Sequence, residues 1–180
     1  MQMFFPSRIV SILLAFAVWA FAPLLLALIC LRLPDSVFDP SRFFWRARKW
    51  EREGRFYETV FHVRSWKQFL PDGGGVWKNR GYKKRNLADY SEENLRRFLI
   101  ETARGELTHW LGILPFWVFG FFAPPFVVWI MLLYALAVNL PCIVAQRYNR
   151  PRVVALMRRM YPHPVQATPG RKNKSNGSAI

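Results

Sequence analysis

The fold is decided by an uncharged run from Trp110 to Ala145, which reads WLGILPFWVFGFFAPPFVVWIMLLYALAVNLPCIVA. Its 36 residues include no acidic or basic side chain. One straight helix of this length would extend about 54 Å, well beyond the hydrocarbon core of a bilayer. Gly120 and the pair Pro124-Pro125 favour a bend within the run. The run therefore predicts a membrane hairpin over residues 110–145.

A second uncharged run lies near the N-terminus, from Ile9 to Leu31, and has 23 residues. About 20 apolar residues are enough to cross the hydrocarbon core, and neighbouring elements can tolerate Pro23 inside such a helix. A cleaved signal peptide is the alternative, but its apolar region is usually shorter, roughly 7–15 residues. We therefore expect a transmembrane helix over residues 9–31.

The distribution of charge predicts how the chain is oriented. The net charge is +15, from 26 basic and 11 acidic residues, a balance that nucleic-acid-binding proteins share. Long uncharged stretches interrupt the basic residues, and no nucleic-acid-binding motif is present, so we expect no nucleic acid partner. Residues 33–106 hold all 11 acidic residues and 16 basic ones, and residues 146–180 hold 8 basic residues. The positive-inside rule then predicts a multi-pass protein of the cell membrane, with its polar bulk in the cytoplasm and its N-terminus outside.

Residues 33–109 should form a small cytoplasmic or interfacial region. Within it, residues 42–70 alternate aromatic residues with arginine and lysine, which suits an amphipathic element in the headgroup layer or aromatic packing in a small domain. A helix is predicted to begin near Ser91, because Ser91 can cap it and apolar residues follow at helical spacing. The residues at helical spacing are Leu95, Phe98, Leu99, Thr102 and Glu106.

Together these patterns predict a mainly α integral membrane protein with an N-terminal transmembrane helix, an amphipathic cytoplasmic portion and a C-terminal helical hairpin. Residues 146–160 form a basic segment after the hairpin. Residues 161–180, which are rich in proline, lysine, asparagine and serine, are expected to be disordered. Cys30 and Cys142 lie in apolar segments and have neither metal-ligand spacing nor a disulfide framework.

The densest ionisable cluster lies just before the hairpin, where Glu101, Arg104, Glu106 and His109 fall within nine residues. On a helix Glu106 and His109 are i,i+3 neighbours, so the carboxylate could orient the imidazole and fix its tautomer. Such an imidazole can take a proton from a hydroxyl while that oxygen attacks an acyl carbonyl. Glu-x-x-His also occurs in metal sites, but these need a second such pair, so we expect no metal. A purely structural set of salt bridges is the other alternative.

The second motif is QRYNRPR, from Gln146 to Arg152. Its three arginines can bind phosphates bidentately, and we expect Arg147 and Arg150 to hold the phosphates of an acyl donor. A basic cluster that stops translocation is the alternative, and it requires only charge. Because the hairpin returns the chain to one side, the two motifs should meet at the inner membrane surface.

These motifs resemble the glycosyl-4,4'-diaponeurosporenoate acyltransferase family, small enzymes of staphyloxanthin-type carotenoid synthesis. The matching pieces are EREGRFYE from Glu51, VRSWKQFLPDGG from Val63, KKRNL from Lys83, ETARGELTHW from Glu101 and NLPCIVAQRYNRPR from Asn139. The resemblance implies a membrane enzyme that esterifies a fatty acyl group onto the glucose 6-position of a glycosylated carotenoid. It implies the catalytic residues His109, Glu106, Glu101 and Arg104, and the substrate-binding residues Gln146, Arg147, Asn149, Arg150, Arg64, Trp66, Lys67 and Asp72.

Our functional hypothesis is therefore a membrane O-acyltransferase in which His109 is the base and Glu106 orients it. Its partners would be membrane lipid, a glycosylated carotenoid or another glycolipid as acceptor, and an acyl donor. Acyl-CoA and acyl carrier protein both remain open as donor, and no other cofactor is expected. The competing hypothesis is a non-catalytic scaffold or subunit of such a pathway, in which the arginines bind lipid headgroups.

Overall fold

The computed structural model describes residues 7–70 and 90–162, and in these ranges the chain is helical without a strand. The class is therefore mainly α, as predicted. The α-helices are α1 (Arg8–Arg32), α2 (Arg55–Phe61), α3 (Val63–Trp66), α4 (Glu92–Ile113) and α5 (Pro125–Met160). The 3-10 helices are η1 (Asp35–Phe38), η2 (Lys49–Gly54), η3 (Lys67–Phe69) and η5 (Leu114–Phe121).

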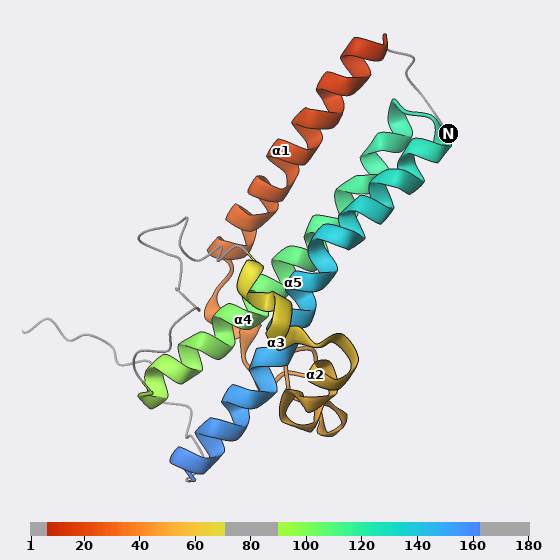
Figure 1. Cartoon of the computed structure of the whole chain (residues 1–180). Helices are drawn as coiled ribbons and strands as arrows, with labels where there is room; N and C mark the ends of the chain where they lie inside the picture. Colours follow the sequence, from red (N-terminus) through yellow and green to blue (C-terminus); the bar gives the residue numbers. More distant parts are fainter. Residues whose placement is uncertain (1–6, 71–89, 163–180) are drawn as a thin grey trace, which may run out of the picture.

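The architecture is an antiparallel helical hairpin with α1 beside it (Figure 1). One arm is α4 continued by η5, and the other arm is α5. The chain turns back after Phe122 and Ala123, and Pro124 and Pro125 then begin α5. Proline is well suited to this position, because the first turn of a helix has no use for its missing N–H. The chain thus bends between Gly120 and Pro125, where the glycine and the prolines predicted it.

Helix α4 begins where the sequence predicted. The Ser91 hydroxyl caps it by accepting a hydrogen bond from the Asn94 N–H at 3.4 Å. The residues noted at helical spacing are buried, and near the beginning of α4 they pack against the end of α5 in a cluster of Leu95, Phe98, Leu99 and Val153. Since early residues of α4 contact late residues of α5, the two helices run antiparallel.

Helix α5 does not end where the uncharged run ends. It continues without a break from Pro125 to Met160, through Pro141 and Pro151. The motif QRYNRPR, which we expected to follow the membrane helix as a separate segment, therefore lies inside the same helix. A rigid helix fixes the arginines relative to the apolar half, so their positions follow from the packing of α4 on α5.

Two helices, α1 and α5, are long and apolar enough to cross a membrane. The most apolar window of α1 has no buried residue, and large exposed side chains such as Phe16, Phe21 and Leu25 lie along it. Helix α1 contacts the hairpin through Trp19, whose indole N–H donates to the Met131 sulfur at 3.3 Å and whose ring packs edge-on against Tyr134. Exposed apolar surface of this extent on both helices suits a lipid environment.

The segment between η2 and η3 is a series of short helical pieces, not one amphipathic helix (Figure 1). Burial of Trp45 and Tyr57 agrees with the interpretation of aromatic packing in a small domain, whereas Trp50 and Phe56 are exposed. Their place in a headgroup layer stays a prediction. Three consecutive residues, Arg52, Glu53 and Gly54, have positive φ values of 47°, 55° and 87°. This left-handed turn directs η2 back onto α5 and buries Glu51.

Two sequence predictions lie outside the described residues. Asp72, expected to bind substrate, belongs to residues 71–89, and most of the predicted disordered tail belongs to residues 163–180.

Gly54→Ala should destabilise the protein. A Cβ at Gly54 would lie 2.7 Å from the Tyr148 carbonyl oxygen and 2.9 Å from Arg152 Cγ, at a φ of +87°. The left-handed conformation alone costs about 1–2 kcal/mol for a residue with a side chain, and the backbone clash adds to this. Unfolding in detergent should show a loss of at least about 2 kcal/mol. Gly120→Ala is the control, since its added Cβ has Val128 Cγ2 at 4.0 Å; equal effects of the two variants would contradict the prediction.

Candidate functional site

A buried carboxylate of α4 lies between two arginines of α5. Glu106 Oε1 accepts a hydrogen bond from Arg147 Nε at 2.7 Å, and Glu106 Oε2 lies 2.7 Å from Arg150 Nη2. The side chains of Glu106 and Arg150 are 2% and 1% exposed, and that of Arg147 is 20% exposed. Charges removed from water to this degree are stable only when they are paired, so these contacts tie α4 to α5.

A second carboxylate, Glu51, completes this charge cluster of Glu51, Glu106, Arg147 and Arg150. Glu51 is fully buried and lies 3.9 Å from Arg147 Nη1. Its Oε1 accepts from the Tyr57 hydroxyl at 2.8 Å, and its Oε2 accepts from the Arg48 backbone N–H. Burial, and then the hydrogen bond to Glu51, raise the pKa of Tyr57, which therefore stays a neutral donor. The cluster holds two negative and two positive charges and is neutral overall.

The arginines also fasten the loop before η2 onto the hairpin. Arg147 Nη2 donates to the Phe44 carbonyl oxygen at 2.7 Å, and Arg150 Nη1 donates to the Trp45 carbonyl oxygen at 3.3 Å. The Arg150 guanidinium lies 5.7 Å from the centre of the Trp45 ring. Arg150 Nε approaches the Thr102 hydroxyl at 3.4 Å. Most of the guanidinium nitrogens of both arginines thus contact oxygen atoms of the protein.

This geometry changes the role that we expected for the two arginines. We expected Arg147 and Arg150 to hold the phosphates of a donor, but Arg150 is buried and paired with Glu106. A phosphate could reach it only by displacing the carboxylate. In the structure, the two arginines position α4, η2 and the loop relative to one another.

His109 lies one turn beyond Glu106 on α4, toward the uncharged half of the hairpin. Its Nδ1 is 3.0 Å from the Asn139 Oδ1 of α5. The Asn139 amide nitrogen donates to the Ala135 carbonyl oxygen at 2.9 Å, which fixes the amide orientation and directs Oδ1 toward the ring. Because Oδ1 can only accept, Nδ1 must carry a proton, and in the neutral ring the lone pair is on Nε2. We expected Glu106 to orient His109; Asn139 holds Nδ1 instead, because the arginines engage Glu106.

Gly112 makes room for this contact. A Cβ at Gly112 would lie 3.0 Å from Asn139 Oδ1. Asn139 itself is 9% exposed. A side chain at residue 112 would therefore press on the amide that holds His109.

Glu101 and Arg104 belong to a different contact region. Arg104 pairs with Glu101 and with Asp35 of η1, and its guanidinium lies 5.0 Å from the centre of the Phe38 ring. These contacts fasten η1 to α4. Of the four residues predicted to be catalytic, the structure therefore groups Glu106 and His109 toward α5, and Glu101 and Arg104 toward η1.

Three of the remaining predicted residues, Lys67, Asn149 and Arg64, lie near the buried Tyr148 of α5. Lys67 Nζ donates to Asn149 Oδ1 at 3.3 Å and lies 4.8 Å from the centre of the Tyr148 ring. Arg152 donates to the Tyr148 hydroxyl, and a hydrogen bond to Tyr148 raises the pKa of the exposed Arg64. Burial, followed by the charges of Arg152 and Arg64, lowers the pKa of Lys67.

Two further predicted residues have clear positions. Trp66 is half-buried and donates its indole N–H to the Phe61 carbonyl oxygen at 2.7 Å. Gln146 is a half-buried residue of α5, one residue before Arg147.

Sequence reasoning assigned no site role to the residues that hold the predicted ones. These residues are Glu51, Tyr57, Thr102, Gly112 and Asn139. Asn139 had a signal, because it is the only carboxamide in the 36-residue uncharged run. A polar side chain at membrane depth is costly unless it has a partner, which is reason to look for one on a neighbouring helix.

Glu106→Gln should destabilise the fold strongly, because it leaves the buried Arg150 without its counter-charge. Breaking a buried pair from one side costs about 3–5 kcal/mol, and Glu106→Gln/Arg150→Met should recover much of this loss. The measurement is unfolding in detergent. Glu53→Gln is the matched control, because the Glu53–Arg159 pair is 54% and 72% exposed. If both single variants cost the same, the buried cluster does not hold the hairpin together.

Comparison with known proteins identifies the family. The family model described as glycosyl-4,4'-diaponeurosporenoate acyltransferase matches residues 39–159. Proteins of that name from Staphylococcus aureus strains bovine RF122 / ET3-1 and USA300 are both 36% identical over 140 residues, covering 78% of this chain and 84% of theirs. No solved structure matches the chain. The matched region includes the charge cluster, His109 and Asn139, and the chain belongs to the glycosyl-4,4'-diaponeurosporenoate acyltransferase family.

Proposed function

We propose that this protein is a membrane acyltransferase that esterifies a fatty acyl group onto a sugar hydroxyl of a glycosylated carotenoid or a similar glycolipid. The family and the names of the relatives support acyl transfer in carotenoid glycoside modification. The single observation that carries the proposal is the contact of His109 with Asn139, which gives a positioned base next to the uncharged half of the hairpin.

The position of His109 suits a substrate with an apolar body and a polar head. On one side lie Glu106 and the charge cluster, and on the other side begins the uncharged run at Trp110. A carotenoid or lipid tail would lie along the exposed apolar surface of the hairpin, and its sugar would then be at the level of the imidazole. His109 is half-buried, so a hydroxyl can approach it while access of bulk water is limited.

The proposed chemistry is transfer of an acyl group from a thioester. His109 Nε2 accepts the proton of the sugar hydroxyl as its oxygen attacks the thioester carbonyl carbon. The tetrahedral intermediate collapses, the carbon–sulfur bond breaks, and the proton on Nε2 passes to the departing thiolate. The products are the sugar ester and a free thiol, and no metal or redox cofactor takes part. The ring must keep its proton on Nδ1 throughout, and Asn139 Oδ1 enforces this.

His109→Asn should lower the turnover number at least about 100-fold, because general base catalysis typically contributes 10²–10⁴-fold. The measurement is ester formation by purified protein with a labelled acyl thioester and a glycosylated carotenoid. His62→Asn is the control, since His62 is an exposed residue between α2 and α3. Normal turnover by the His109 variant would refute its role as base, and no turnover by the unaltered protein would favour a scaffold.

Gly112→Ala should lower the turnover number about tenfold while the KM for either substrate changes little. The added methyl group displaces the Asn139 amide and loosens the imidazole, without removing a charge or a substrate contact. Steady-state kinetics with both substrates separate the two constants. A change confined to KM would place Asn139 in substrate binding instead of in the positioning of His109.

We also infer that the protein is a multi-pass protein of the cell membrane with its N-terminus outside. The charge asymmetry supports this orientation, since Arg32, the described residues 33–70 and the end of α5 bring most of the described basic residues to one end of the helices. The charge cluster and His109 would then face the cytoplasm, where acyl thioesters are found.

A further inference from the structure

A groove of about 1390 Å³ lies between the segment before α2 and the polar ends of α4 and α5. Seven of the described residues that line it are basic and two are acidic. Four of the basic residues lie between residues 46 and 52, one is Arg96 of α4, and Arg158 and Arg159 end α5. The chemistry that we have proposed for His109 uses none of them.

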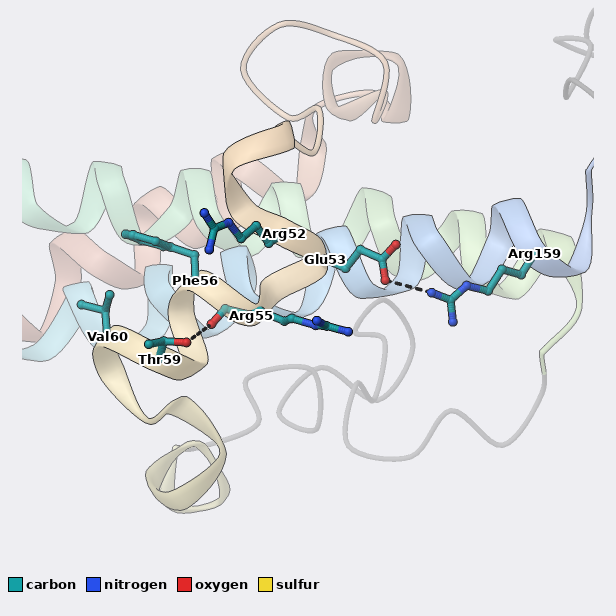
Figure 2. A pocket seen from close by; sticks show the side chains of 7 residues that line it. All are labelled: Arg52, Glu53, Arg55, Phe56, Thr59, Val60 and Arg159. Carbon is teal, nitrogen blue, oxygen red and sulfur yellow. Dashed lines mark hydrogen bonds and ion pairs between the residues drawn. The ribbon is translucent and has the colours of Figure 1, made fainter.

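Local contacts account for part of this charge. Arg46 and Arg48 lie over the Phe43 ring, and Arg48 also donates to the Phe43 carbonyl oxygen at 3.1 Å. Arg158 and Arg159 complement the negative end of the α5 dipole, as basic residues at a helix C-terminus commonly do. Arg159 also pairs with Glu53 at 2.9 Å, and this pair spans from η2 to the end of α5 (Figure 2). It separates the groove from an adjoining hollow of about 630 Å³ that Arg55 lines. The other acidic residue, Asp39, accepts hydrogen bonds from the backbone and side chain of Ser41.

The fold thus brings like charges from three separate segments to one concave surface. Like charges repel, so this arrangement carries a Coulombic cost that a bound anion of high charge would relieve. Arginine is suited to this, because its planar guanidinium binds phosphate bidentately. The groove also has an apolar floor of Leu99, Val154, Met157 and Tyr161, which a flat aromatic base can cover.

We propose that this groove binds the 3′-phosphorylated adenosine diphosphate of coenzyme A, so that acyl-CoA is the donor. This proposal rests on the acyl transfer proposed above. A concave surface with an apolar floor suits a small polyanion that carries a base better than the broad surface of a carrier protein, because specific protein interfaces need about 800 Å² per partner.

The distance along the helices from the groove to His109 is comparable to the length of the pantetheine arm. Leu99 and Pro151 line the groove, 10 residues before His109 on α4 and 12 residues after Asn139 on α5. At 1.5 Å per residue, these offsets are about 15 and 18 Å along the helices. The arm has about twelve bonds between the phosphate ester and sulfur, as many as about four residues of backbone, and extends about 14 Å. The fully extended arm is about 1–4 Å shorter than these two offsets, so delivery of the thioester to the imidazole requires the diphosphate to lie at the end of the groove nearest His109.

The test is equilibrium binding of coenzyme A to the full-length protein in detergent, with dephospho-coenzyme A as a second probe. The unaltered protein should bind coenzyme A, should bind dephospho-coenzyme A more weakly, and should lose affinity as salt is raised. Lys49→Gln/Arg96→Gln/Arg158→Gln removes one cation from each segment and should weaken coenzyme A binding about tenfold. The control is Arg97→Gln, an exposed residue beside Arg96 that does not line the groove, and it should bind normally.

The possible outcomes separate this inference from the proposed acyl transfer. Equal coenzyme A binding by the triple variant and the unaltered protein overturns the groove proposal. So does acyl transfer from carrier protein by a protein that does not bind coenzyme A, and in that case the acyltransferase function stands. If the triple variant loses only its binding to phosphatidylglycerol vesicles, the groove holds lipid headgroups and the proposal fails. Groove-dependent coenzyme A binding without any ester formation supports the groove and overturns the proposed function.

Discussion

The pairing of Glu106 with Arg147 and Arg150 is the constraint on which the rest of the structure depends. Burying these charges is tolerable in one register of α4 on α5 only, because a slip of either helix would leave a charge unpaired away from water. That register brings His109 to Asn139 on the apolar side of the cluster. The same arginines bind the backbone of Phe44 and Trp45 and so fix the loop that leads into η2.

The features of the fold that depend on one segment could be predicted from the sequence. The uncharged runs, the proline bend and the cap at Ser91 each act locally, and each is where it was expected. The segment from Lys49 to Phe69 could not be predicted in this way. Its course depends on four residues with positive φ, Arg52, Glu53, Gly54 and His62, of which only Gly54 is a glycine, and on the burial of Glu51 against a helix almost 100 residues away.

The contacts within the site could likewise be predicted only in part from the sequence. Helical spacing places Glu106 beside His109 and Glu101 beside Arg104, and an exposed pair of this kind is worth only about 0.2–0.5 kcal/mol. Between two packed helices water is excluded, and leaving a buried charge unpaired there costs about 3–5 kcal/mol. Glu106 is accordingly paired with the arginines of α5, and the imidazole contacts Asn139. The prediction that the two motifs meet is confirmed. Which side chains pair between the two motifs depends on the register of α4 on α5. Residue spacing within one helix cannot predict that register.

The neutral charge cluster also bears on how an acyl donor could be bound. The carboxylates of Glu51 and Glu106 neutralise Arg147 and Arg150. The motif QRYNRPR, which we expected to bind phosphate, therefore has little net positive charge at these two arginines. The groove at the ends of α4 and α5 has the opposite character, with seven basic residues against two acidic ones. A donor that carries several negative charges would be attracted to the groove and not to the cluster, and only its uncharged arm would need to pass toward His109. The cluster, which is neutral overall, would then lie between the phosphates and the reacting carbonyl. It would fix the register that brings His109 to Asn139 without binding the donor itself.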